Sequence, residues 1–402
     1  IISAILAGAV TLIGVLIANG KSQAVTDTKL EELTREGLLT QKELDAARRA
    51  DPDRVDYAWL HQTRIPLLRR AWERGRVCYA QPLAEFMVEE ADWLPDYALF
   101  LALRERFGGK ELKDWPDEIR LRHPSALARY RAELADECAF HAFLQLLFFR
   151  QWTAVKAYAN GKGISIIGDL PIYVSPDSAE VWSRPELFQL KEDMTPSGVA
   201  GVPPDAFSDK GQHWGNPLYG WDYHRQTGFA WWRHRAAHLA RLYDVVRIDH
   251  FRAFHTYWSI PAGAKSAKEG HWEPGPGLEL LQLLQTASPK LELIAEDLGD
   301  LDQDALHFVR TCGIPGMKVM VFAFDPQGES AYLPHNCQPF SVVYTGTHDT
   351  PTFVQFLNEA RLEESSYARR YLRLREEEGL GWGVISGAWA SGSYLAIAPL
   401  QD

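Results

Sequence analysis

The sequence predicts an α/β fold, a parallel β/α barrel of which six strands can be recognised, preceded by a helical part. Three observations support this prediction. Apolar residues recur at helical spacing in the chain before residue 164. From there on, short continuous apolar runs alternate with turns and helical stretches, a pattern typical of βα units whose strands are buried on both faces. Acidic residues follow several of these runs, and a β/α barrel carries its active site at the C-terminal ends of its strands.

The composition indicates a folded protein and excludes several functional classes. The chain has 402 residues, of which 46 % are hydrophobic and 24 % are charged, so disorder is excluded for most of its length. A net charge of −11 argues against binding to nucleic acid. Aromatic residues make up 12 % of the chain, and aromatic faces suit flat, semi-polar ligands such as sugar rings.

The four cysteines, Cys78, Cys138, Cys312 and Cys337, are scattered and form no CxxC pair. This spacing argues against a zinc site and against a disulfide framework. The histidines near the acidic motifs also lack the spacing of helical metal ligands, so we expect neither a metal nor a cofactor. Unpaired thiols fit a reducing compartment, and we expect a cytoplasmic protein.

The beginning of the chain differs in character from the rest. Residues 1–20 carry no charge, and an apolar stretch of that length can span a bilayer. We interpret residues 1–24 as an apolar, membrane-like segment, with any membrane contact confined to residues 1–20; a buried apolar helix is the alternative reading. Residues 25–50 are polar, with Leu at helical spacing, and are interpreted as a linker with a short helix.

Residues 51–163 are expected to form a helical subdomain. The stretch 137–159 is apolar nearly all round, which is typical of a buried helix, and Asn160, Gly161 and Gly163 are expected to end it.

Residues 164–402 are expected to form the partial barrel. The predicted strands are 164–167, 245–248, 291–295, 317–322, 342–345 and 394–400. A closed barrel of this kind has eight strands, so the prediction describes an incomplete ring. The acids that follow successive strands lie further apart than the roughly 30 residues of a minimal βαβ unit, so we expect inserted loops.

Three segments place an acid at a predicted strand end: VVRIDHFRAF with Asp249, ELIAEDLGD with Glu296, and VVYTGTHDTPTF with Asp349. Cleavage of a glycosidic bond needs two carboxyl groups, one that attacks or activates water and one that donates a proton. Arg247 lies two residues before Asp249, so both side chains point to one face of a strand and the guanidinium favours an ionised Asp249. Glu296 needs a raised pKa to act as the acid. Taken singly, each acid could instead cap a helix or form a structural ion pair.

From about Gly37 to its end, the sequence resembles the amylomaltases, the 4-α-glucanotransferases of glycoside hydrolase family 77 in the α-amylase clan. The most similar segments are IIGDLPIYV (166–174), GVPPDAFSDKGQHWGNPLYGW (201–221), VVRIDHFRAF (245–254), YWSIPAGAKSAKEGHWEPGPG (257–277), IAEDLG (294–299) and YTGTHDT (344–350). The resemblance implies a TIM (β/α)8 barrel of which strands three to eight are present. The family's His-Pro-Thr-Ser-Leu-Pro motif and its C-terminal stretch do not occur, so the chain resembles a member that is truncated at both ends and joined to an unrelated apolar segment.

The resemblance also implies roles for single residues. Asp249 aligns with the nucleophile of a retaining transfer, Glu296 with the acid/base, and Asp349 with the residue that stabilises the transition state. The implied substrate-binding and supporting residues are Arg247, His250, His348, Asp169, Asp205, Trp214, Gly215, Asn216 and Trp258. The segment 257–277 is implied to form a loop over the groove, which would exclude water and favour transfer over hydrolysis. The implied partners are maltooligosaccharides and other α-1,4-glucans.

Three other functions remain open at this point. An α-glucan hydrolase would turn maltotriose into shorter sugars only, whereas a transferase would also make longer ones. An inactive glucan-binding fragment, suggested by the two missing strands, would not respond to the loss of Asp249. A membrane-tethered scaffold is suggested by residues 1–20, and partition of a version lacking residues 1–24 into the soluble fraction would count against it.

Overall fold

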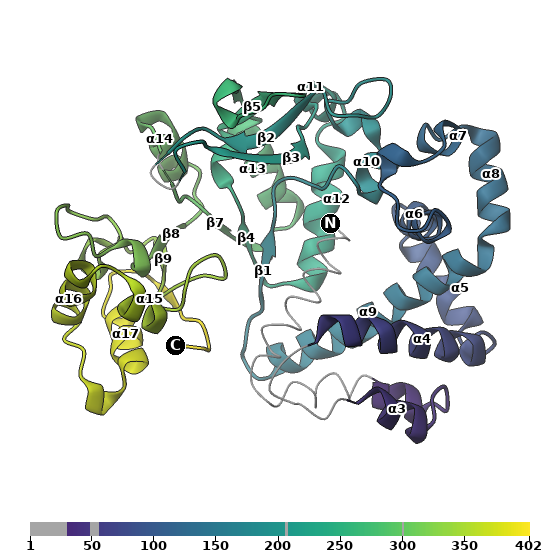
Figure 1. Ribbon diagram of the computed structural model, residues 1–402, viewed down its shortest axis with the longest axis horizontal. Helices are drawn as coiled ribbons and strands as arrows, with labels where there is room; N and C mark the ends of the chain where they lie inside the picture. Colours follow the sequence, from purple (N-terminus) through teal and green to yellow (C-terminus); the bar gives the residue numbers. More distant parts are fainter. Residues whose placement is uncertain (1–29, 49–55, 206–207, 300) are drawn as a thin grey trace.

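The computed structural model describes residues 30–48, 56–205, 208–299 and 301–402. The helices of the first part form the right-hand half of Figure 1. Their bounds are α3 Gln41–Ala47, α4 Tyr57–Gly75, α5 Ala80–Glu89, α6 Leu94–Arg106, α7 Asp117–Arg120, α8 Pro124–Glu133 and α9 Ala135–Gly161. The helix expected over 137–159 is α9, and Gly163 follows it with a φ of +75°. Its burial is less complete than predicted, because its buried residues end at Phe149 and Tyr158 is 71 % exposed. The apolar segment 1–24 lies outside the described residues. Among the helices that are described, none combines the length and the apolar character needed to cross a membrane.

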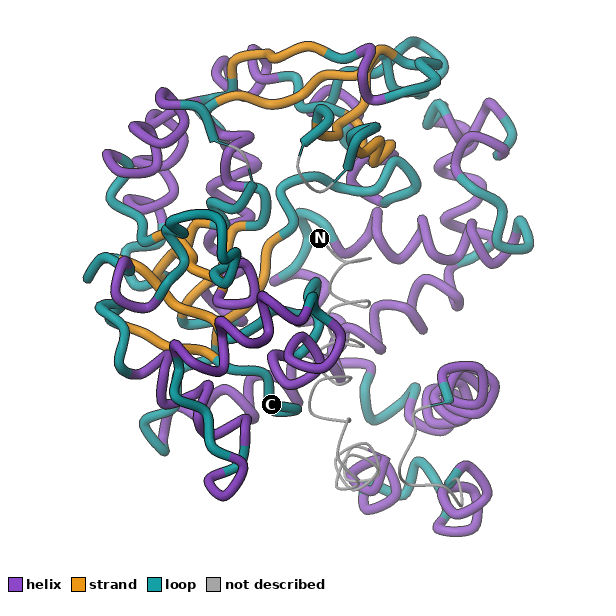
Figure 2. The backbone as a smooth tube through the Cα atoms, turned by 60° about the vertical axis from the view of Figure 1, so that its left-hand side comes forward, coloured by secondary structure: helices purple, strands orange, loops and turns teal. Residues whose placement is uncertain are grey.

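The central element is a sheet of six parallel strands that pair in chain order. The strands are β1 Ile167–Leu170, β4 Val245–Ile248, β7 Glu292–Ala295, β8 Gly316–Val319, β9 Ser341–Tyr344 and β10 Leu395–Ile397. Figure 2 shows these strands as a strongly curved sheet with helices around it. Within the described residues the sheet is open between β1 and β10. All six predicted strands therefore belong to one parallel, barrel-like sheet, and the predicted fold class is confirmed.

The helices that connect and surround the strands are shorter than α9. Their bounds are α10 Ala179–Ser183, α11 Trp221–Gln226, α12 Ala230–Leu242, α13 Gly277–Ala287, α14 Gln303–Thr311, α15 Phe353–Glu359, α16 Leu362–Tyr371 and α17 Leu380–Trp389. Two large apolar cores result. One joins the helices before β1 to β1, β4, α12 and α13, and the other lies between β7 to β10 and α15 to α17.

Three strands differ from the sequence prediction by more than one residue, and the last of them, predicted as 394–400, is limited to Leu395–Ile397. The first strand is Ile167–Leu170 rather than 164–167, because the preceding residues belong to the connection from α9: the backbone N–H of Ile166 donates to Asp244 Oδ2 at 2.8 Å. The predicted run 317–322 is a strand only as far as Val319, and a 3₁₀ turn, Met320–Phe322, follows it. Apolar character continues through both connections, so hydrophobicity alone could not place these ends.

A second, antiparallel sheet was not predicted. Its strand order is β3-β2-β5-β6, with β2 Gly198–Val202, β3 Gln212–Pro217, β5 Thr256–Pro261 and β6 His271–Pro274. It crosses the top of Figure 1, beyond the C-terminal end of β4. Its strands are rich in glycine and polar residues, which carry a weak strand signal. Within the segment 257–277, implied to form a loop over the groove, residues 257–261 and 271–274 belong to β5 and β6, and the residues between them connect these two antiparallel strands.

Trp182 links the helical part to the connection after β1. It is fully buried on α10, its ring centroid lies 6.0 Å from those of Phe100 and Trp115, and its indole N–H donates to Ile119 O at 2.9 Å. We expect Trp182→Ala to lower the free energy of unfolding by about 3–5 kcal/mol, since it leaves a large cavity and removes a buried hydrogen bond. Trp389→Ala is the matched control: that indole is 67 % exposed, and its loss should change stability by less than about 0.5 kcal/mol. Urea unfolding followed by circular dichroism compares the two, and equal losses would contradict this packing.

Candidate active site

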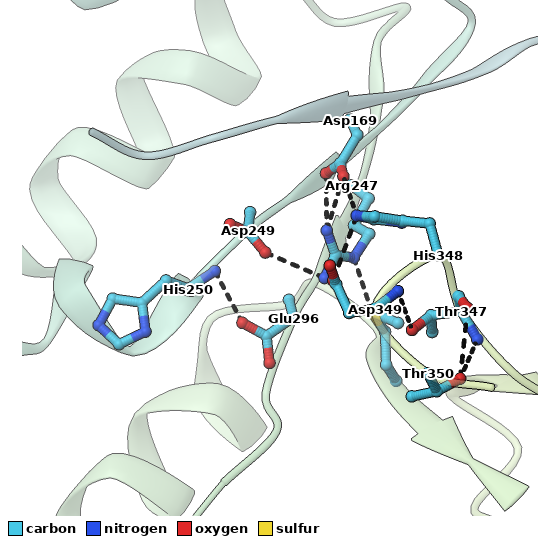
Figure 3. A network of polar contacts seen from close by, with 10 residues as sticks. Asp169, Arg247, Asp249, His250, Glu296, Thr347, His348, Asp349 and Thr350 are labelled. Carbon is cyan, nitrogen blue, oxygen red and sulfur yellow. Dashed lines mark hydrogen bonds and ion pairs between the residues drawn. The ribbon is translucent and has the colours of Figure 1, made fainter. Parts of the chain in front are cut away.

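Arg247 is the buried centre of the candidate site. It pairs in register with Asp169 across β4 and β1, and its Nη1 donates to both carboxylate oxygens of Asp169 at 2.8 Å. Its Nη2 lies 3.0 Å from Asp249 Oδ1, just beyond the end of β4. One guanidinium thus holds two carboxylates, and Figure 3 shows both of them directed toward it.

The pKa of Asp249 differs from the sequence expectation. The ion pair with Arg247 is present and lowers this pKa, as expected. Burial of the carboxyl group raises it, however, and so do the negative charges of Asp169 and Asp349. The net direction is upward, because loss of hydration outweighs the single guanidinium. The side chain still has 40 % of its surface exposed, so it is open to a ligand.

Glu296 directly follows β7 and is oriented by backbone donors. Its Oε2 accepts the N–H of His250 at 2.7 Å, and its Oε1 accepts the N–H of Leu298 at 2.8 Å. Burial and then the negative charge of Asp249 raise the pKa of Glu296 to about 7, against these two hydrogen bonds. A raised pKa is what the proton donor of a glycosidic cleavage requires. At neutral pH a large fraction of Glu296 therefore carries a proton that it can donate.

Asp349 lies on the loop that follows β9 and completes the acidic group. Its side chain is 66 % exposed, and its Oδ2 lies 3.2 Å from Nε2 of His348, which also lies 3.8 Å from Asp169 Oδ2. The charge of Asp349 contributes to the raised pKa of Asp249, just as Asp249 contributes to that of Glu296. The three acids predicted from the sequence therefore act on one another, and Figure 3 shows them grouped around Arg247.

The His250 ring packs against Trp214, and Figure 3 shows it directed away from the three acids, so that only the backbone N–H of His250 reaches Glu296. His250 adopts a left-handed backbone conformation, with φ +50°, and its ring contacts the indole of Trp214 edge to face at 4.8 Å. Burial and the charge of Arg252 lower the pKa of His250 to about 4, so its imidazole is neutral at pH 7. Its Nε2 is buried and bonds to nothing among the described residues. Tyr173, which sequence reasoning did not single out, stacks obliquely against both rings.

The contacts of the other predicted substrate residues tie strands and connections to one another. Gly215 lies on β3 with φ +78°, and the Asn216 side chain donates to Val174 O at 2.8 Å, which ties β3 to the connection after β1. Asp205 accepts the N–H of Ser208 at 2.8 Å in the β2–β3 connection.

Trp258 belongs to the second sheet. It lies on β5, opposite Trp272 of β6, and donates its indole N–H to Ala267 O at 2.8 Å. For none of Trp258, Gly215 and Asn216 does the described part of the chain show a hydrogen bond or ion pair with the three acids.

Two contacts of this site could not be read from the sequence motifs. The thioether of Met317 on β8 lies 3.2 Å from Nε of Arg247, and the carboxylate of Asp297, adjacent to Glu296, points toward β8. The pattern that could have pointed to Asp297 is the pair Glu296-Asp297 itself, because adjacent residues at a strand end face opposite ways.

The arrangement offers two carboxyl groups in different states. Asp249 faces the guanidinium of Arg247. Glu296 is buried, and its surroundings raise its pKa to about 7. Pairs of acids whose environments separate their protonation states are typical of acid/base and nucleophilic catalysis at a glycosidic bond.

Comparison with known proteins agrees with this geometry. The sequence profile of glycoside hydrolase family 77, described as 4-alpha-glucanotransferase, matches residues 6–402, so the match includes most of the apolar segment 1–24. The 4-alpha-glucanotransferase of Thermus thermophilus is 45 % identical over 361 residues, covering 87 % of this chain and 72 % of the relative. The 4-alpha-glucanotransferase of Clostridium butyricum is 40 % identical over 376 residues, which cover 93 % of this chain and 77 % of the relative.

Solved structures give the same result. The amylomaltase from Streptococcus agalactiae, determined in complex with acarbose, superposes with a TM-score of 0.87 at 40 % identity and covers 92 % of this chain and 76 % of its own. The amylomaltase from Corynebacterium glutamicum, at 19 % identity and a TM-score of 0.62, supports the fold alone. With the profile, the relatives and the fold in agreement, this chain belongs to the 4-alpha-glucanotransferase family, the amylomaltases of glycoside hydrolase family 77.

Proposed function

We propose that this chain transfers α-1,4-glucan segments between maltooligosaccharides by a retaining mechanism, with Asp249 as nucleophile, Glu296 as acid/base and Asp349 as a ligand of the reacting sugar. The observation that carries the proposal is the unequal pair: Asp249 bound to Arg247, and Glu296 with its pKa raised to about 7 beside it. A double displacement requires one ionised and one protonated carboxyl group at the same bond.

In the first step a carboxylate oxygen of Asp249 attacks the anomeric carbon of the donor sugar. The bond from that carbon to the glycosidic oxygen breaks, and the oxygen keeps the electron pair and takes the proton of Glu296. The shortened chain leaves with a free 4-hydroxyl group, and an ester joins the rest of the glucan to Asp249. The exposed carboxylate of Asp349 supplies an acceptor for sugar hydroxyl groups.

In the second step Glu296, now ionised, takes the proton from the 4-hydroxyl group of an acceptor sugar. The hydroxyl oxygen attacks the anomeric carbon, the ester breaks, and Asp249 regains its carboxylate. Two inversions at one carbon retain the α configuration. Trp214, 37 % exposed beside His250, offers a face on which a sugar ring can stack.

Hydrolysis is the second candidate, and it differs only in the acceptor of the second step. Incubation of the purified chain with maltotriose, followed by chromatography, separates the two. Transfer converts two maltotrioses into maltopentaose and glucose, or into maltotetraose and maltose, and then into longer chains. We expect this ladder. Products no longer than maltose would favour hydrolysis, and unchanged maltotriose would favour a glucan-binding protein without turnover.

We further infer that the enzyme acts in the cytoplasm, since all four cysteines are unpaired thiols, which fits a reducing compartment. The membrane contact expected through residues 1–20 stays a prediction about a segment outside the described residues.

A further inference from the structure

The loop after β7 turns two adjacent acids in opposite directions. Glu296 turns to the end of β4, where it accepts the N–H of His250, whereas the side chain of Asp297 is only 8 % exposed and points to β8. There Asp297 Oδ1 accepts the backbone N–H of Met317 at 2.6 Å, and its Oδ2 lies 3.3 Å from Nζ of Lys318. A buried carboxylate with a backbone donor and a cation as partners is fixed in place.

This contact lies where the sheet itself is weakest. β7 and β8 pair at one position, Ala295 with Gly316, whereas β7 pairs with β4 and β8 pairs with β9 over four positions each. Asp297 follows Ala295 by two residues, so its bonds to β8 continue the connection between the two strands beyond the end of their ladder. The Asp297 side chain thus joins the segment that carries Glu296 to β8, whereas backbone hydrogen bonds join the other neighbouring strands of the sheet.

The link from Asp297 to the acid is short. The N–H that binds Oε1 of Glu296 belongs to Leu298, the residue after Asp297. A displacement of Asp297 therefore moves one of the two donors that orient the Glu296 carboxyl group.

Gly316 shows how closely the position of Asp297 is defined. A Cβ atom at Gly316 would lie 2.4 Å from Asp297 Oδ2 and 2.7 Å from its Cγ, distances at which something must shift. The space for the carboxylate exists because this residue of β8 has no side chain.

We propose that Asp297, held by the Met317 N–H and by Lys318, is a positioning residue that orients Glu296 for proton transfer. This inference rests on the proposed function, because it assigns Asp297 a role only through the acid/base.

The charged and titratable groups that face Glu296 come from several elements. Asp249 and Arg247 act from the end of β4, and Tyr332, whose own pKa is raised in part by Glu296, acts from the connection after β8. The positive charge of Lys318 lies beside the carboxylate of Asp297 and compensates its negative charge. Gly316→Ala alters none of these charges, so a change in the pH profile of that variant reports geometry rather than net charge.

The test compares Gly316→Ala with wild type. We expect kcat on maltotriose to fall about 10- to 100-fold with KM changed less than about 3-fold, as for a small misplacement of a catalytic group. We also expect the basic limb of the pH profile to move up by about half a unit to one unit, because the Leu298 N–H lowers the pKa of Glu296 and is weakened. Gly161→Ala is the matched control, since a Cβ there meets nothing within 4 Å at the end of α9.

A donor that needs no acid distinguishes orientation from general damage. Fluoride leaves α-maltotriosyl fluoride without a proton, and azide accepts the glycosyl group without a base, so Gly316→Ala should release fluoride within about 3-fold of wild type. Equal losses on both donors, or a wild-type kcat and pH profile in the folded variant, would overturn the proposal.

If Gly316→Ala does not fold, the transfer rates of Asp297→Ala and Asp297→Asn test the positioning role instead. Both remove the charge, but only Asn can still accept the Met317 N–H, so we expect Asn to recover at least about tenfold of the rate lost in Ala. Equal rates would overturn the proposal. If wild type itself shows no transfer that depends on Asp249, the proposed function fails; if wild type transfers and the variants match it, only the positioning role of Asp297 fails.

Discussion

Asp249→Asn is expected to reduce glucan transfer by at least about 10³-fold, with substrate affinity changed little. The amide has nearly the shape of the carboxylate, but it is a far weaker nucleophile and forms no stable glycosyl ester. The variant also leaves Arg247, which is buried, with Asp169 as its remaining anionic partner. Transfer from maltotriose at saturating concentration, measured as glucose release, gives kcat for the comparison.

Asp222→Asn is the matched control for this change. Its carboxylate is 95 % exposed on α11, and its ion pair with Arg225 spans 3.5 Å at the surface, where such pairs contribute little. We expect wild-type transfer from it. If Asp249→Asn kept more than about a tenth of the wild-type rate, Asp249 would not be the nucleophile.

Glu296→Gln is expected to lower transfer from maltotriose by about 10²- to 10⁴-fold, because the leaving sugar oxygen loses its proton donor. The same change should remove the basic limb of the pH profile. In wild type, Glu296 must be protonated in the first step, so kcat/KM falls as the pH rises through its pKa of about 7. The acid limb, where Asp249 becomes protonated, should persist in the variant. A pH series of kcat/KM from about pH 4 to about pH 9 tests both limbs.

Two comparisons make the result specific to acid catalysis. With α-maltotriosyl fluoride and azide, Glu296→Gln should be within about tenfold of wild type, because neither partner needs a proton transfer. Glu292→Gln, at the exposed start of the same strand, should keep both the rate and the basic limb. A basic limb that persists in Glu296→Gln would assign the titration to another group.

The parallel sheet could be predicted from the sequence because its strands are buried on both faces. Val245–Ile248 and Ser341–Tyr344 read as continuous apolar runs for that reason, and both were placed within one residue. The antiparallel sheet could not be predicted in this way. Strands such as Gln212–Pro217 are largely exposed, and they are held in place by pairing with other strands. Its stability lies in pairing and not in local propensity.

The candidate site shows the same division. Asp249, Glu296 and Asp349 were predictable because parallel strands deliver their C-terminal ends to one edge. The direction of the Asp249 pKa was not, because spacing reveals a neighbouring guanidinium but not the depth at which both groups lie. Nor was the contact of Asp297 with β8, which depends on the absence of a side chain at Gly316.

The most direct test of the account is to trap the glycosyl-enzyme. Glu296→Gln incubated with α-maltotriosyl fluoride, without azide, should accumulate the ester, since its formation needs no acid and its breakdown by a sugar needs the missing base. Mass spectrometry of the intact chain should then show the added maltotriosyl group, and peptide mapping should place it on Asp249. An adduct on any other side chain, or release of fluoride with inversion and no adduct, would contradict a retaining transfer through Asp249.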